Sequence, residues 1–240
     1  MSSTFASPLH GARLRVQLRQ IQESCVYDAV MRLPISTWGA VLLLASWGRF
    51  RHYLESADPA LPLLTYSVNL AMHLSTMAFC ALIVGTVLLR ARPATRARGL
   101  EPRLSALLGS FMATTLIFFP RRDLPVSAEL TSILLIAAGY SLACVALFQL
   151  GRSFSLMPEA RRLVTSGIYG FVRHPLYLAE ELATIGILIQ FFSVWTVVIC
   201  TVHFAFQLRR IHHEERLLSS AFLEYPAYSA QTARLLPGVY

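Results

Sequence analysis

The chain has 240 residues, of which 55% are hydrophobic and 14% charged, with a net charge of +8. Its mean hydropathy of +0.54 is too high for an ordinary soluble domain, and the composition excludes disordered, collagen-like and disulfide-scaffold chains. Most apolar residues lie in long runs, which a nucleic-acid-binding domain could not solvate. The composition therefore predicts a membrane protein whose positive charge faces anionic lipid.

The first 32 residues lack the apolar stretch of a secretory signal peptide, so none is expected. Leu14, Leu18, Ile21 and Cys25 recur at spacings of three and four, with arginines between them. This pattern predicts a basic amphipathic helix, which either lies on the membrane surface or packs against the rest of the protein.

Apolar runs long enough to cross a bilayer follow one another along the chain, separated by prolines and charges. Four runs precede the polar segment 151–174, and they are predicted to span at about 33–50, 63–89, 104–119 and 126–150. A longer apolar stretch, 175–208, would reach about 50 Å as one helix, which exceeds the thickness of the hydrocarbon core. We therefore predict a helical hairpin that turns near 190–193, and about six spans in total, with five as the alternative.

The distribution of arginines favours six spans. With the hairpin, 17 arginines lie on one side of the membrane and four on the other, whereas a single final crossing gives 13 and eight. The positive-inside rule then places both termini in the cytoplasm. The expected architecture is an all-α polytopic helix bundle with an N-terminal segment (1–32), a four-span region (33–150) and a C-terminal region (151–240) that would contain the chemistry.

An Arg-His-Pro element, formed by Arg173, His174 and Pro175, begins the fifth predicted span. Proline suits the first position of a helix, so free backbone N–H groups, the helix dipole and the Arg173 guanidinium would converge there. Such a place favours a carboxylate, although the tripeptide alone equally fits an arginine that reaches lipid headgroups.

Acidic residues follow the hairpin, where Glu214 is four residues after Arg210 on one helix face. Carboxylates are suitable acceptors for ribose hydroxyl groups, and Tyr225 and Tyr228 would add an aromatic wall. Alternatively, these acidic residues form a charged helix face that is exposed to solvent. The string His212-His213-Glu214-Glu215 lacks the two histidines at i and i+4 that a zinc peptidase needs, so no metal site is predicted.

Two further carboxylates, Glu180 and Glu181, stand near the start of the fifth predicted span. Ionisable groups are costly in a membrane and normally face a cavity or a partner. They are expected either to line a substrate channel or to pair with Arg173 or Arg152. His73 and His203, alone in apolar runs, are expected to be hydrogen-bonded core residues.

The C-terminal two fifths of the chain resembles the isoprenylcysteine carboxyl methyltransferase family. The resemblance rests on Leu163-Val164-Thr165-Ser166-Gly167-Ile168-Tyr169, on Arg173-His174-Pro175-Leu176-Tyr177, and on Glu214-Glu215 with Leu218, Phe222, Tyr225, Tyr228, Arg234 and Pro237. The first four predicted spans carry no such signature. The chain has Ile168 where the family often has proline, and Ala179-Glu180-Glu181 where a small residue commonly follows the second motif.

The resemblance implies an S-adenosylmethionine-dependent membrane methyltransferase whose cofactor pocket is closed by the C-terminal segment at the cytoplasmic side. It would act on a lipophilic acceptor that enters from the bilayer, most simply a prenylcysteine-like carboxylate. Arg173 would lie nearest the acceptor and Glu214 would take part in the site. The residues implied to surround the cofactor are Leu163, Val164, Tyr169, His174, Pro175, Tyr177, Glu214, Glu215, Tyr225 and Tyr228.

The sequence is also compatible with two other classes of function. Related membrane enzymes methylate phospholipid amines or small thiols, and sterol-type reductases that use a nicotinamide cofactor share the C-terminal layout. A non-enzymatic scaffold or transporter is the third class, but the chain shows no internal repeat of the kind that transporters contain.

Overall fold

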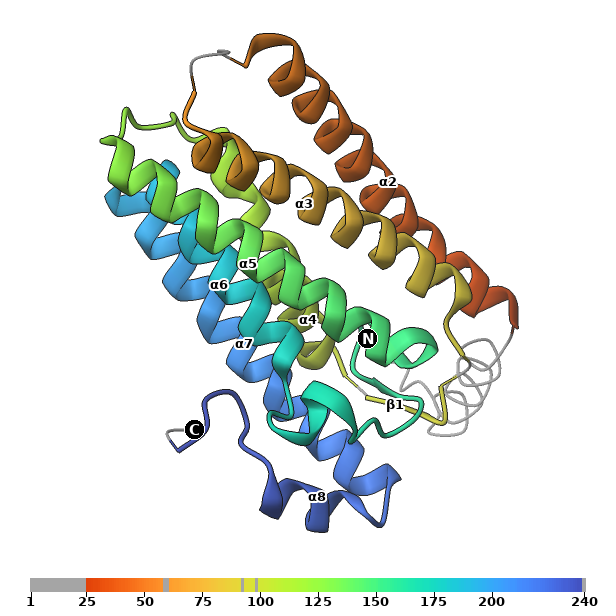
Figure 1. Cartoon of the computed structure of the whole chain (residues 1–240). Helices are drawn as coiled ribbons and strands as arrows, with labels where there is room; N and C mark the ends of the chain where they lie inside the picture. Colours follow the sequence, from red (N-terminus) through yellow and green to blue (C-terminus); the bar gives the residue numbers. More distant parts are fainter. Residues whose placement is uncertain (1–24, 58–60, 92, 98, 239–240) are drawn as a thin grey trace, which may run out of the picture.

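The structure is a computed structural model that describes residues 25–57, 61–91, 93–97 and 99–238. Helices dominate it, as predicted (Figure 1). The longer ones are α2 (Cys25–Ser56), α3 (Leu63–Leu89), α4 (Glu101–Phe111), α5 (Val126–Leu150), α6 (Pro175–Gln190) and α7 (Val194–Ala221). The shorter elements are α8 (Tyr225–Gln231) and the 3-10 helices η1 (Met112–Phe118), η2 (Gly151–Ser153) and η3 (Gly167–Gly170). The predicted amphipathic helix at 14–25 lies almost entirely outside the described residues.

The six longer helices run alternately up and down one bundle, with α5, α6 and α7 side by side (Figure 1). The predicted hairpin is present, since α6 ends at Gln190 and α7 begins at Val194. The turn between them is fixed by a capping box, in which Ser193 and Thr196 bond each other's backbone N–H groups. By length and apolar composition, two of the described helices, Leu63–Leu89 and Val126–Ser153, qualify as membrane spans.

Three predicted elements differ from the structure. The first span was predicted at 33–50, but α2 extends from Cys25 to Ser56 and contains Pro34. The third was predicted as one helix over 104–119, but α4 ends at Phe111 and continues as a 3-10 helix. Thr114 and Thr115 bond backbone carbonyls three residues earlier, which accompanies this tighter winding. The all-α prediction also missed a small antiparallel sheet, in which β1 (Thr95–Arg96) pairs with β2 (Glu159–Ala160).

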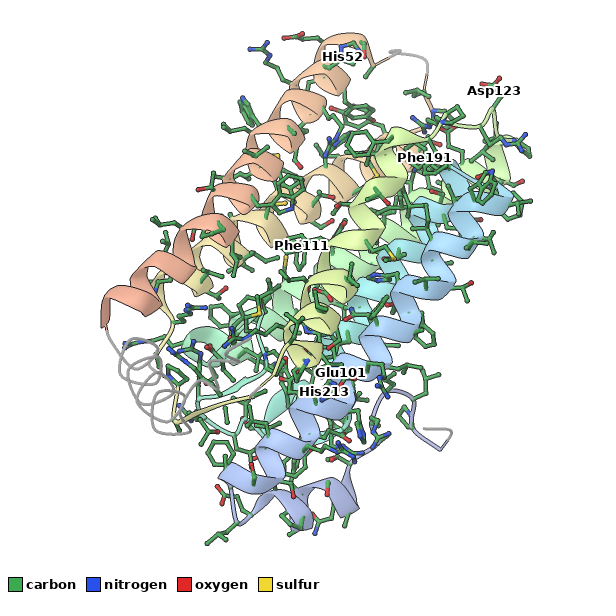
Figure 2. All side chains as sticks on the ribbon, turned by 180° about the vertical axis from the view of Figure 1, so that it is seen from behind. His52, Glu101, Phe111, Asp123, Phe191 and His213 are labelled. Atoms are coloured by element: carbon green, nitrogen blue, oxygen red, sulfur yellow. The ribbon has the colours of Figure 1, made fainter. Side chains whose placement is uncertain are left out.

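The polar segments gather at one end of the bundle, where β1, the 151–174 loops, the end of α7 and α8 lie together (Figure 1). Figure 2 shows Glu101 and His213 at this end and Asp123 and Phe191 at the other. The main apolar core joins α3, α5 and α6 with the 151–174 segment, through residues such as Val87, Leu147, Phe154 and Leu176. That core therefore fixes the polar end to the bundle.

Close packing of α5 on α6 depends on Gly139. A Cβ atom there would stand 2.6 Å from the backbone N of Ala183 and 2.7 Å from the carbonyl O of Ala179. We expect Gly139→Leu to destabilise the bundle by about 1–3 kcal/mol or more, because backbone atoms cannot move aside. Thermal unfolding in detergent measures this, with Gly85→Leu as the control, since nothing lies within 4 Å of a Cβ at Gly85. Equal melting temperatures for the two variants would contradict this packing.

Candidate active site

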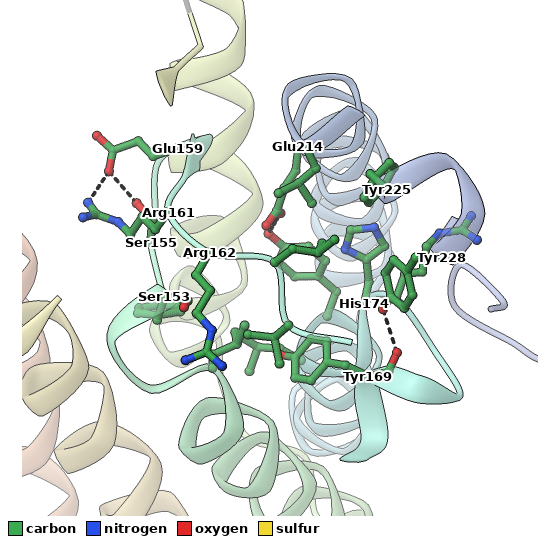
Figure 3. A pocket seen from close by; sticks show the side chains of 18 residues that line it. Ser153, Ser155, Glu159, Arg161, Arg162, Tyr169, His174, Glu214, Tyr225 and Tyr228 are labelled. Atoms are coloured by element: carbon green, nitrogen blue, oxygen red, sulfur yellow. Dashed lines mark hydrogen bonds and ion pairs between the residues drawn. The ribbon is translucent and has the colours of Figure 1, made fainter. Parts of the chain in front are cut away.

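A cavity of about 720 Å³, counting the part open to solvent, lies at the polar end of the bundle (Figure 3). Its walls come from the end of α5, the 151–174 loops, the first turn of α6, and α7 and α8. The lining includes most of the predicted site residues: Leu163, Val164, Tyr169, Arg173, His174, Tyr177, Glu214, Tyr225 and Tyr228. Segments from Leu150 to Tyr228 thus contribute to one cavity.

Four predicted site residues do not line this cavity: Pro175, Glu215, Glu180 and Glu181. Pro175 is buried and begins α6 directly after the cavity residue His174. Glu215 lies behind the lining in an ion cluster. Glu180 and Glu181 lie further along α6, away from the cavity.

The Arg-His-Pro element is held by the C-terminal segment. The backbone N–H of Arg173 donates to the carbonyl O of Ala233 at 2.8 Å, and that of His174 to Arg234 at 3.2 Å. His174 has a non-helical backbone conformation, as the residue before a proline should. The chain after α8 therefore runs beside the start of α6, and α8 itself contributes Tyr225 and Tyr228 to the cavity wall.

Glu215 is the centre of an ion cluster that also joins the start of α6 to the C-terminal segment, here through side chains. Its Oε1 lies 2.9 Å from Nε of Arg173 and 3.2 Å from Nε2 of His174, and its Oε2 lies 2.6 Å from Nη2 of Arg234. Burial would raise the pKa of Glu215, but the hydrogen bonds from His174, Arg234 and Arg173 outweigh it and lower the pKa to about 2. Glu215 is therefore ionised throughout the physiological range.

The Arg173 guanidinium has partners within the protein. Besides Glu215, it donates through Nη1 to the carbonyl O of Ser229, at 2.6 Å, and to that of Thr232. The sequence predicted that Arg173 binds the acceptor carboxylate. Arg173 lines the cavity, and its Nε and Nη1 bind Glu215 of α7 and the carbonyls of Ser229 and Thr232, so it also holds the C-terminal segment in place.

Glu214 presents its carboxylate to the cavity. Its Oε2 accepts a hydrogen bond of 2.5 Å from the hydroxyl group of Tyr177. The Tyr177 ring packs under Arg210, whose guanidinium carbon is 4.7 Å from the ring centroid. Arg210 is itself fixed by Ser110 Oγ, at 2.9 Å, and by the carbonyl O of Leu156, at 3.0 Å. The sequence left open which of the two glutamates faces the pocket, and the structure selects Glu214.

Aromatic side chains form one wall of the cavity. Tyr225 and Tyr228 meet edge to face with ring centroids 6.0 Å apart, and the Tyr228 hydroxyl donates to the carbonyl O of Tyr169 at 2.6 Å (Figure 3). His174 stacks on Tyr177 at 5.4 Å. Burial raises the pKa of Tyr169, Tyr225 and Tyr228, so these phenols stay neutral and can donate hydrogen bonds at pH 7.

The predicted partners of Glu180 and Glu181 were wrong. Glu180 accepts a hydrogen bond from Nε2 of Gln207 at 3.1 Å, and Glu181 lies 3.1 Å from Nε2 of the buried His203. Arg152, one of the expected partners, binds the carbonyl O of Leu89. Both glutamates thus tie α6 to α7. His203 is buried as expected, but its polar contact is the ion pair with Glu181 and not the expected hydrogen bond.

Several cavity residues were not identified from the sequence. Ser153, Phe154, Ser155, Glu159, Arg161 and Arg162 come from the segment before the first family motif. Arg162 directly precedes Leu163, and this adjacency to the motif was the available signal. Across the described parts of the chain, no group of three or more His, Cys, Asp or Glu side chains is placed to hold a metal ion.

Comparison with known proteins gives a match to the model of the Isoprenylcysteine carboxyl methyltransferase (ICMT) family over residues 131–220. The predicted family resemblance is confirmed for this region. The region contains the loops that carry Arg173, the whole of α6, and most of α7 with Glu214. The match and the two apolar helices together indicate a membrane protein whose 131–220 region is similar to this methyltransferase family.

A curated relative is the cobalt-zinc-cadmium resistance protein CzcN of Cupriavidus metallidurans, which is 36% identical over 76 residues. The aligned segment covers 31% of this chain and 35% of CzcN. The chain therefore matches about a third of the length of this relative.

Proposed function

We propose that the protein is an integral-membrane, S-adenosylmethionine-dependent methyltransferase that acts on a lipophilic acceptor, most simply a prenylcysteine-like carboxylate. The observation that carries this proposal is the position of Glu214. It is the carboxylate of the acidic pair that faces the cavity, within the region that matches the methyltransferase family. S-adenosylmethionine bound in the cavity would supply the methyl group, which the nucleophilic atom of the acceptor takes by in-line displacement of the sulfide.

The cavity residues fit such a cofactor. Glu214 uses Oε2 to accept from Tyr177, and no hydrogen bond from a described residue reaches its Oε1. That oxygen is therefore available to a ribose hydroxyl group. Tyr225, Tyr228 and His174 offer aromatic faces to an adenine ring or to the sulfonium cation.

The chemistry requires positioning rather than a strong base. A carboxylate acceptor is already ionised at pH 7, so no side chain has to remove a proton from it. The main contributions of the protein would be to align the reacting atoms and to exclude water. The ion cluster around Glu215 would serve both, because it ties the start of α6 and the C-terminal segment to α7 beside the cavity.

Calorimetric titration of the full-length protein in detergent tests this proposal. We expect S-adenosylhomocysteine to bind with one site per chain, and a reduced nicotinamide nucleotide to give no heat of binding. Binding of the nicotinamide compound alone would contradict the proposal and favour a reductase.

We further propose that the polar end of the bundle, with the cavity and the C-terminus, lies in the cytoplasm, and that the helices cross the membrane six times. Asp123 and Ala230 lie on opposite ends of the bundle and are exposed. In a variant without the four native cysteines, Asp123→Cys is expected to react with an impermeant maleimide from outside intact cells. Ala230→Cys is expected to react only after the cells are opened. Equal labelling of both positions from outside would refute this topology.

A further inference from the structure

Three arginines line the cavity, and two of them are neutralised within the protein. Arg173 binds Glu215 and two backbone carbonyls. Arg161, whose side chain is 0% exposed, lies 2.5 Å from Glu159, which also pairs with Arg96 at 3.1 Å. Neither of these guanidinium groups is free to neutralise a ligand.

The third arginine, Arg162, differs from both. Its side chain is exposed and lines the cavity, and it makes no hydrogen bond or ion pair with any residue that the structure describes. Figure 3 shows it descending from the loop after β2, on the side of the cavity away from Tyr225 and Tyr228. A positive charge without a counter-ion in a partly enclosed cavity attracts an anion.

The cavity carboxylates do not supply this anion. Glu159 is already bound by Arg96, Arg161 and the hydroxyl group of Ser155. Glu214 projects from α7 and accepts a hydrogen bond from Tyr177. The described part of the chain therefore supplies no counter-ion to Arg162, and its charge is available to a bound anion.

The segments beside Arg162 supply apolar residues to the cavity, together with the polar Ser153, Ser155 and Glu159. Leu150, Phe154, Leu163 and Val164 line the same cavity and come from the end of α5 and the loop that carries Arg162. A cation beside an apolar wall suits a molecule with an anionic group and a hydrocarbon tail. Glu214 comes from α7 and Tyr225 and Tyr228 come from α8, and these residues are suited to a nucleoside.

We infer that Arg162 is the specificity-determining residue that binds the anionic group of the methyl acceptor. This inference rests on the proposed methyltransferase function and assigns to Arg162 the contact that the sequence assigned to Arg173. Planar guanidinium groups bind carboxylates through two parallel hydrogen bonds, so Arg162 would also orient the acceptor.

The test compares two ligands that differ in one charge: N-acetyl-S-farnesylcysteine and its neutral carboxamide. Binding of each is measured to full-length wild-type protein, to Arg162→Gln and to the control Arg216→Gln, in nanodiscs of phosphatidylcholine with S-adenosylhomocysteine present. Arg216 is also exposed, but it does not line the cavity. The titration is repeated with phosphatidylglycerol added to the nanodiscs.

We expect wild-type protein and Arg216→Gln to bind the acid about tenfold more tightly than the amide. Arg162→Gln should lose this preference through weaker binding of the acid alone, and its affinity for S-adenosylhomocysteine should not change. Equal binding of acid and amide by wild-type protein, or binding of neither, would overturn the inference. Arg162→Gln could instead lose affinity equally for the acid and the amide, and only in nanodiscs that contain phosphatidylglycerol. That result would assign Arg162 to lipid headgroups and would also overturn the inference.

The two proposals can fail separately. If wild-type protein binds S-adenosylhomocysteine but does not distinguish acid from amide, the role of Arg162 is refuted and the methyltransferase proposal stands. If it does not bind S-adenosylhomocysteine, the methyltransferase proposal fails, whatever the two acceptor ligands show.

Discussion

Replacing Glu215 by glutamine is expected to lower the free energy of unfolding by about 3–5 kcal/mol, because it removes the buried carboxylate that pairs with Arg173 and Arg234. The Glu215 side chain is 12% exposed, so water replaces little of the lost interaction. The C-terminal segment should also detach from the start of α6. Thermal unfolding in detergent and the rate of tryptic cleavage after Arg234 measure the two effects.

The control for this prediction is Glu129→Gln. Glu129 pairs with Arg121 at 3.0 Å, but the two side chains are 47% and 54% exposed, so the pair contributes less than about 1 kcal/mol. If Glu215→Gln and Glu129→Gln unfold at the same temperature, the cluster does not hold the C-terminal segment.

The same cluster predicts a pH dependence. Folding lowers the pKa of Glu215 from 4.5 to about 2, so its contribution to stability is complete above pH 4.5. That contribution is lost as the pH falls from about 4.5 towards 2, where the folded state also becomes protonated. The difference in melting temperature between wild type and Glu215→Gln should therefore narrow over this interval. A difference that stays constant down to pH 2.5 would contradict the lowered pKa.

Replacing Glu214 by glutamine is expected to weaken the binding of S-adenosylhomocysteine about 10- to 100-fold, since a charged acceptor for the ribose hydroxyl groups is lost. The melting temperature should change little, because Glu214 lies on the cavity wall and is only half-buried. Calorimetry measures the affinity. The matched variant Tyr177→Phe removes the hydrogen bond to Glu214 but keeps the carboxylate, so it should lose less affinity. Unchanged affinity in Glu214→Gln would remove Glu214 from the cofactor site.

Helices that are apolar from end to end could be predicted almost residue by residue. The runs at 63–89 and 126–150 coincide with α3 and α5, because prolines precede both and charge or glycine follows. The bounds of α2 were missed, because the helix continues beyond both ends of the apolar run 33–50 and contains Pro34. The 3-10 winding after Phe111 was missed as well, because it depends on threonine hydrogen bonds that no apolar pattern records.

For the candidate site, the sequence motifs identified which segments meet but not which atoms pair. Arg173 and Glu215 are 42 residues apart, and no local spacing predicts their 2.9 Å contact. Glu180 and Glu181 could be recognised as needing partners, but Gln207 and His203 were found only when α6 and α7 were seen together. Arg162 was overlooked because its distinguishing property is the absence of a described partner, which is a property of the folded chain.

The central claim is that the cavity faced by Glu214 uses S-adenosylmethionine to methylate a lipophilic acceptor. Its most direct test is to incubate purified protein in nanodiscs with methyl-tritiated S-adenosylmethionine and N-acetyl-S-farnesylcysteine, and to count the tritium that enters the organic phase as base-labile ester. We predict base-labile label with wild-type protein and at least tenfold less with Glu214→Gln at subsaturating cofactor. No transfer by wild-type protein, or equal transfer by both, would contradict this account.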